Sequence, residues 1–169
     1  TDTLHPGGAE RVAVDLANFL WSKGHQVFFC ATRMKGSLEE AIDPGIFITC
    51  LNRTSTFSGL YKFRKYVLQN RIEIVHAHGN SSAQFCVLSL MGLSSIKIIH
   101  HDHNPVLEKR NQFVQRIILG RADHWIVVSK PIYAWVIEKA GFRNPRLILN
   151  PINTHRFKTC AEALTLPVT

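Results

Sequence analysis

The sequence predicts an α/β fold in which helices flank a parallel β-sheet on both faces, giving three layers. Short apolar runs alternate along the chain with segments whose apolar residues recur at helical spacing, which is the pattern of a doubly wound sheet. The 169 residues suffice for one domain with a sizeable core. The composition, 46% hydrophobic and 19% charged, is that of a globular protein and not of a disordered one.

The predicted elements alternate in type. An apolar stripe marks the first helix, which ends near Gly24 and carries Ala9, Val12, Ala13, Leu16, Ala17 and Leu20 on one face. Further helices are predicted around residues 60–67, 81–93, 107–119 and 132–136. Strands are predicted at the short apolar runs 26–32, 46–51, 72–78, 96–100, 124–128 and 146–149.

The start of the chain lacks room for a full first strand. A glycine loop that opens a helix normally follows a strand, but only five residues precede Pro6, and a strand needs ~5 residues of its own. We therefore expect the first strand to be truncated and the centre of the sheet to be poorly covered.

The charge balance indicates an anionic partner. The net charge is +8 and the pI is near 9.6, which suits nucleic acid, an acidic membrane surface or a phosphate-bearing substrate. No RNA- or DNA-binding motif is present, so nucleic acid is not an expected partner. No apolar run approaches the ~20 residues of a membrane span. The four cysteines form no CxxC pair, and Cys30 and Cys50 lie in apolar runs, so we expect buried thiols and a cytoplasmic location.

The first candidate site is the glycine loop Gly7-Gly8-Ala9-Glu10-Arg11. Two glycines allow close approach of a ligand, and a helix N-terminus behind them suits a phosphate. The alternative interpretation is a strand-to-helix turn that needs unusual backbone angles. The loop matches neither GxxxxGK[ST] nor GxGxxG, which weakens adenylate- and NAD-type interpretations.

The second candidate site is a group of histidines. His76 and His78 lie on one face at the end of a predicted strand, and the run His100 to His103, which includes Asp102, follows the next strand. Both groups should reach the carboxyl edge of a parallel sheet, where ligands bind. Three interpretations remain open: metal ligands, a sugar-binding cleft floor in which one imidazole acts as base or donor, or structural hydrogen-bonding residues.

Two weaker signals come from polar and basic residues. Ser129 is a candidate helix cap, and Lys130 contacts a phosphate or is simply solvated. Basic and aromatic residues on two predicted helices suit either an anionic lipid surface or plain solvation. These residues are Tyr61, Lys62, Arg64, Lys65 and Tyr66 on the first, and Lys109, Arg110, Arg116 and Arg121 on and beside the second.

Taken in order, five segments resemble the N-terminal domain of family 4 glycosyltransferases, which have the Rossmann-like GT-B fold. The segments are residues 6–27 (PGGAERVAVDLANFLWSKGHQV), 74–79 (IVHAHG), 98–104 (IIHHDHN), 123–130 (DHWIVVSK) and 149–157 (LNPINTHRF). The third is similar to the turn of capsule and exopolysaccharide transferases. The resemblance implies that residues 1–157 form the acceptor-side domain, and that 158–169 are a tail or the start of a crossover to a C-terminal domain that is absent.

The resemblance also implies a function. The expected enzyme is a retaining glycosyltransferase that transfers a hexose from a nucleotide diphosphate sugar to a saccharide or lipid-linked acceptor. It would be bacterial, and either cytoplasmic or peripheral to the inner membrane. Gly7, Gly8 and Arg11 would face the donor diphosphate. The candidate catalytic residues are His103 and His101, and the acceptor side would be lined by His78, Asp102, Asn104, Ser129 and Lys130.

The resemblance implies neither a bound metal nor a cofactor in this domain. Because the donor binds mainly to the second domain in this family, we expect the fragment alone to be inactive. Two rivals remain: a metal-dependent hydrolase that uses the His76/His78 and His101/His103 pairs, and a non-catalytic module that binds saccharide or membrane.

Overall fold

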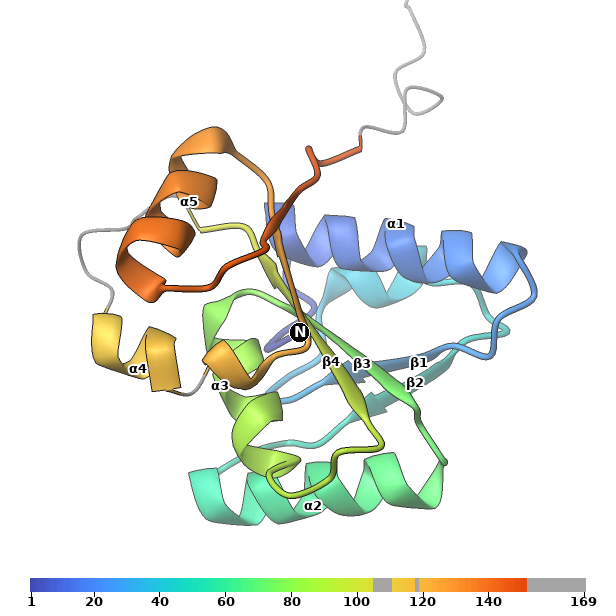
Figure 1. Cartoon of the computed structure of the whole chain (residues 1–169). Helices are drawn as coiled ribbons and strands as arrows, with labels where there is room; N and C mark the ends of the chain where they lie inside the picture. The colour runs from blue at the N-terminus through green and yellow to red at the C-terminus, as the bar shows by residue number, and fades with distance from the viewer. Residues whose placement is uncertain (105–110, 118, 152–169) are drawn as a thin grey trace, which may run out of the picture.

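Parallel strands and helices alternate along the chain, as the sequence predicts (Figure 1). The computed structural model describes residues 1–104, 111–117 and 119–151, and the tail predicted at 158–169 lies outside these ranges. The first half contains α1 (Gly8–Ser22), β1 (Phe28–Ala31), the 3-10 helix η1 (Ser37–Ala41), β2 (Phe47–Cys50), α2 (Thr56–Gln69) and β3 (Ile74–His78). The second half contains α3 (Asn80–Ser89), β4 (Lys97–Asp102), α4 (Gln112–Ile117), the 3-10 helix η2 (Leu119–Arg121), β5 (His124–Val127), α5 (Lys130–Trp135), the π-helical turn η3 (Val136–Ala140) and β6 (Arg146–Leu147).

The described strands form two parallel sheets. One pairs β1 with β2, and the other has the order β3-β4-β5-β6. Helix α1 covers one face, and α2 and α3 lie on the other (Figure 1). The predicted three-layer α/β fold is therefore confirmed. Since paired strands run parallel, the ends of β3, β4 and β5 meet at one edge of their sheet.

Strand β4 is longer than the sequence indicates. It was expected to end at His100 but continues to Asp102, so His101 lies within the strand and not in the loop after it. The reason is tertiary: His101 pairs with Ile126 of β5 and Asp102 with Val127, and these ladder contacts extend the strand beyond its apolar run. The helix predicted at 107–119 is present as α4, and residues 105–110 and 118 lie outside the described ranges.

Residues 1–4 run alongside β1 and past its end. The Thr1 amino group donates to the Cys30 carbonyl at 3.1 Å, the Thr32 amide donates to the Thr1 carbonyl at 3.1 Å, and Leu4 N–H donates to the Met34 carbonyl at 3.2 Å. A single parallel bridge joins Thr3 to Met34. This short segment is thus fastened beside β1 by backbone hydrogen bonds.

Among the residues that the structure describes, two hydrophobic cores support the sheets. The first contains residues from Leu4 to Ile46 and lies between α1, η1 and the β1-β2 pair. The second contains residues from Leu51 to Ala140, including the fully buried Trp125. Cys30 and Cys50, which we expected to be buried, are half-buried free thiols. Burial raises the pKa of the Cys30 thiol to about 11.

Candidate functional site at the carboxyl edge of the sheet

The site begins where β3 turns sharply into α3. His78 ends β3, and Gly79 follows with φ of +87° and ψ of 157°, a conformation that is accessible essentially only to glycine. The Gly79 amide donates to the His101 carbonyl at 2.9 Å, which fastens the turn to β4. Sequence reasoning did not select Gly79, although a glycine between a predicted strand and a predicted helix was the available signal.

Four imidazoles gather at this edge. His76 and His78 share a face of β3, and the strand register places His101 directly beside His78. His103 follows two residues later on the same face. Neighbouring ring centroids are 4.5 Å apart for His76 and His78, 5.0 Å for His78 and His101, and 4.2 Å for His101 and His103. The predicted gathering of these histidines is therefore present, and we call the four residues the histidine cluster.

The histidine cluster is held together by contacts between neutral rings. Nε2 of His76 lies 3.3 Å from Nδ1 of His101, and Nδ1 of His78 lies 3.1 Å from Nε2 of His103. In each pair one nitrogen must carry a proton and the other must accept it, which requires that at least the accepting ring is neutral. Nε2 of His101 and Nδ1 of His103 are buried and have no hydrogen-bond partner among the described residues.

Burial keeps these imidazoles uncharged at neutral pH. Loss of water, with a smaller contribution from the neighbouring histidines, lowers the pKa of His76 to about 4 and that of His101 to about 3. The pKa of His78 is well below its usual value for the same reasons. Burial also lowers the pKa of His103, although the Asp102 carboxylate opposes that change. The cluster therefore offers neutral donors and acceptors, as a sugar hydroxyl requires.

Asp102 faces away from the histidine cluster. It is fully buried, and its carboxylate accepts the Asn104 backbone N–H at 3.2 Å, which closes the turn after β4. Asn104 itself is exposed. On the same face as Asp102, His100 packs against Trp125 with ring centroids 4.7 Å apart. The observed geometry thus gives Asp102 a role in shaping the turn that carries His103 and Asn104.

The glycine loop has an ordinary backbone. Gly7 is extended, with φ of −157°, so the interpretation as a turn with unusual angles is wrong. Gly7 and Gly8 are exposed, and Arg11 is half-buried with its amide bonded to the Gly7 carbonyl at 2.9 Å. A side chain at Gly7 would collide with the Glu10 carboxylate, whereas one at Gly8 would meet nothing within 4 Å. Within the described residues, no side chain caps the start of α1, which leaves its first N–H groups available to an anion.

The remaining predicted site residues have structural surroundings. Ser129 caps α5, since its hydroxyl accepts the Ile132 amide at 3.5 Å, and Lys130 is exposed. Arg64, which we placed on a basic face, donates instead to the carbonyls of Ser89 and Met91 at 3.2 and 2.9 Å, at the end of α3. Lys109 and Arg110 lie outside the described residues. Within the described part of the chain, no helix is both long and apolar enough to cross a membrane.

The model of Glycosyltransferase Family 4 matches residues 6–156. The chain belongs to this family. No curated protein sequence matches the chain. The family 4 match includes the glycine loop and every residue of the histidine cluster, so both candidate sites are parts of a glycosyltransferase domain. The family is the one that the five ordered segments predicted.

A metal is the other ligand that the histidine cluster could hold. One nitrogen each from His76, His78 and His101 lies within 4.8 Å of the others. Neutral imidazole is a good ligand for zinc and related ions. The rings would have to move closer together, because nitrogens at ~2.1 Å from a zinc ion must lie within ~4.2 Å of one another.

Proposed function

We propose that this family 4 domain is the acceptor-side half of a retaining glycosyltransferase. It would act with a second domain to transfer a hexose from a nucleotide diphosphate sugar to a saccharide or lipid-linked acceptor, in the synthesis of capsule or exopolysaccharide. The histidine cluster at the carboxyl edge is the observation that carries the proposal. It supplies several neutral hydrogen-bonding groups in one place, which is what recognition of sugar hydroxyls needs.

The site residues divide into two groups by position, one at the histidine cluster and the turn after β4, and the other at the start of α1. His101 and His103 would contact the transferred sugar, and His78 and Asn104 would line the acceptor side. Asp102 would hold the turn in which His103 and Asn104 stand. Gly7, Gly8 and Arg11, at the uncapped start of α1, would face the donor diphosphate, because free N–H groups and the helix dipole favour an anion there.

Transfer assays on the intact protein test the proposal. With a panel of nucleotide-sugars and saccharide acceptors, His103→Gln should lower kcat/KM by ~10²-fold through the loss of one hydrogen bond in the transition state. His25→Gln, at an exposed position on the loop after α1, is the matched control. If the intact protein neither transfers nor hydrolyses any sugar of the panel, the proposal is wrong.

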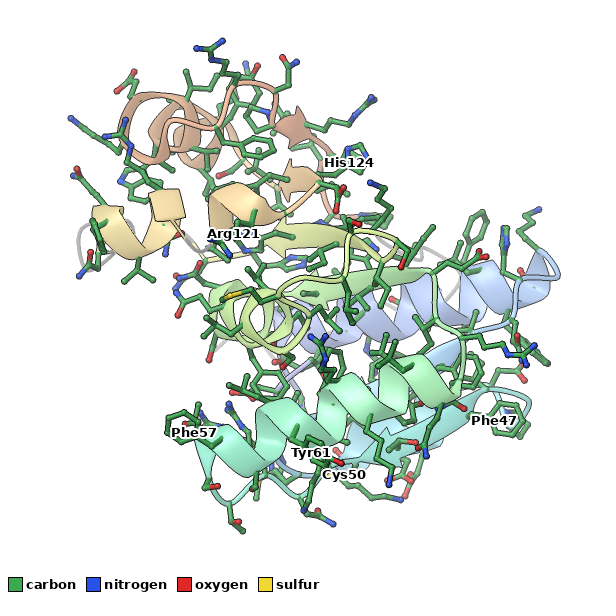
Figure 2. All side chains as sticks on the ribbon, turned by 60° about the horizontal axis from the view of Figure 1, so that its bottom comes forward. Phe47, Cys50, Phe57, Tyr61, Arg121 and His124 are labelled. Carbon is green, nitrogen blue, oxygen red and sulfur yellow. The ribbon has the colours of Figure 1, made fainter. Side chains whose placement is uncertain are left out.

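Helix α2 supports docking of the domain on an anionic membrane. Phe57 and Tyr61 are 86% and 69% exposed, and Figure 2 shows both on the outer side of α2. Lys62 and Lys65 are exposed on the same helix. Aromatic rings beside lysines are the composition of helices that lie on acidic lipid.

Vesicle sedimentation tests this docking. The protein should bind vesicles containing phosphatidylglycerol more than pure phosphatidylcholine ones, and the double variant Phe57→Ser, Tyr61→Ser should lose about tenfold in binding. Phe19→Ser, on α1 at the other face of the sheet, is the control because Phe19 is also exposed, at 55%. Equal loss in both variants, or equal binding to both lipids, would contradict the docking surface.

The rival function is a metal-dependent hydrolase built on His76, His78 and His101, whose nitrogens lie close together. It requires stoichiometric zinc or manganese in the purified protein and loss of activity with a chelator. Transfer activity that survives exhaustive chelation excludes this rival.

A further inference from the structure

Three imidazoles of the histidine cluster converge from two neighbouring strands. His76 and His78 are two residues apart on one face of β3, which separates their Cα atoms by ~6.6 Å. The register puts His101 of β4 beside His78, at the ~4.8 Å spacing of adjacent strands. One nitrogen from each of the three rings lies within 4.8 Å of the others. The ladder between β3 and β4 therefore holds a triangle of imidazoles in place.

One pair in this triangle has the spacing of two ligands on a single metal ion. Nε2 of His76 lies 3.3 Å from Nδ1 of His101. Two nitrogens that bind one tetrahedral zinc ion at ~2.1 Å stand ~3.4 Å apart, whereas the donor and acceptor of an ordinary N–H hydrogen bond are ~2.9 Å apart. His78 can complete the set by rotation of its ring, since that torsion has a broad energy minimum.

His103 is placed to orient one of the three rings. Its Nε2 lies 3.1 Å from Nδ1 of His78, which leaves Nε2 of His78 for an ion. A histidine that binds a metal commonly uses its other ring nitrogen in a hydrogen bond that fixes the ring. His103 would thus position His78 and would not be a ligand itself.

The donor set selects the chemical class of the ion. Imidazole nitrogens suit zinc, cobalt and related transition-metal ions, whereas Mg²⁺ and Ca²⁺ take oxygen ligands. Three histidines with water in the fourth position are a recurrent zinc environment. His76 is half-buried, in contrast to the buried His78 and His101, so an ion can approach from its side.

An ion in this position would compete with a sugar. A ring nitrogen that coordinates a cation has no lone pair left to accept a hydrogen bond from a hydroxyl group. Under the proposed function, His101 contacts the transferred sugar and His78 lines the acceptor side. Coordination would therefore remove acceptors from both parts of the sugar site at once.

We propose that His76, His78 and His101 bind one zinc-like divalent cation, and that occupancy of this site inhibits sugar transfer. The inhibition rests on the proposed transferase function, whereas the binding does not. A metal-dependent hydrolase would lose activity when a chelator removes its ion. The transferase would instead gain activity, because its metal-free form is the active one.

Cobalt and zinc titrations of the metal-stripped intact protein test the binding. One equivalent of Co²⁺ should give the visible absorption bands of an imidazole site, without the near-ultraviolet band of a thiolate ligand. Zn²⁺ should displace the Co²⁺ and raise the temperature of unfolding, and Mg²⁺ should do neither. His76→Gln should weaken zinc binding by about 100-fold or more. His25→Gln, at an exposed position outside the cluster, should bind zinc as the parent protein does.

Transfer assays test the inhibition as the ratio of rates with and without zinc, taken separately for each variant. At a free zinc concentration of about ten times Kd, the rates of the parent protein and of His25→Gln should fall about tenfold. A chelator should restore both rates. His76→Gln should keep its own rate in the presence of zinc, whatever that rate is.

The metal site is overturned if the parent protein forms no one-to-one Co²⁺ complex or shows a thiolate band, and neither result depends on a variant that folds. Equal zinc affinity in folded His76→Gln and the parent protein would also overturn it. Full transfer activity in the zinc-saturated protein would overturn the inhibition. Zinc binding by a protein that transfers no sugar would contradict the proposed function and the inhibition with it, but would leave the metal site standing.

Discussion

Acidification should destabilise the fold through the histidine cluster. Between pH 7 and pH 5 the unfolded chain binds protons on imidazoles whose ordinary pKa is 6.5, whereas folded His76 and His101, with pKa values of about 4 and about 3, stay neutral. The unfolded state therefore binds protons that the folded state does not bind. The contribution of these two buried, neutral imidazoles to the free energy of unfolding is fully present above pH 6.5 and is lost as the pH falls below that value.

The size of the effect follows from those pKa values. Each such histidine lowers the free energy of unfolding by about 1.4 kcal/mol for each pH unit below its unfolded pKa, or by about 2 kcal/mol between pH 7 and pH 5. His76 and His101 together give about 4 kcal/mol as an upper limit, and about 3 kcal/mol after allowing for water at the half-buried His76. His78 and His103 act in the same direction, because burial lowers both pKa values.

Urea unfolding at pH 7, 6 and 5 measures this loss. Replacing His76 and His101 with glutamine should reduce the slope of unfolding free energy against pH by up to about 1.4 kcal/mol per unit for each histidine removed. His25→Gln, at an exposed position outside the cluster, controls for the loss of an imidazole. An unfolding free energy that stays constant from pH 7 to pH 5, or a double variant with the slope of the parent chain, would refute the reasoning.

Three further predictions concern stability, each measured by denaturant unfolding. Gly79→Ala should cost about 1–3 kcal/mol because of its positive φ, whereas Gly8→Ala, with open space around its Cβ, should cost nothing; equal effects would contradict this backbone argument. Ser129→Ala should cost about 1 kcal/mol through loss of the α5 cap, and a threonine at that position should restore most of it. Trp125→Ala should cost about 3–5 kcal/mol, since the ring is fully buried in the second core; a loss below 1 kcal/mol would show that the core is not packed around it.

Local pattern predicts much of this fold and part of the site. The alternation of apolar runs and helical stripes is enough to predict the parallel sheets and their flanking helices. Period-two geometry alone puts His76 and His78 on one face. Ser129 has the residue type and the position of a helix cap, and it is one.

The features that sequence did not predict depend on contacts between distant segments. His101 belongs to β4 because β5 supplies ladder partners beyond the apolar run. Arg64 lies among the basic residues expected on a solvated helix face, but the end of α3 lies beside α2, and the Arg64 guanidinium donates to the carbonyls of Ser89 and Met91 there. The absence of strain at Gly7 was not predictable either, because a glycine pair is compatible with both extended and left-handed backbone.

The two cores have a consequence for the order of folding. The buried side chains of the first core come from residues 4 to 46 and those of the second from residues 51 to 140, so the two sets are consecutive along the chain, and of β1 only the half-buried Cys30 packs against the second core. During synthesis, every fully buried side chain of the first core leaves the ribosome before any fully buried side chain of the second. Contacts that are close in sequence form early and at small cost in loop entropy. The N-terminal segment that contains the first core can therefore collapse as a separate cooperative unit, on which the histidine-bearing remainder is assembled afterwards.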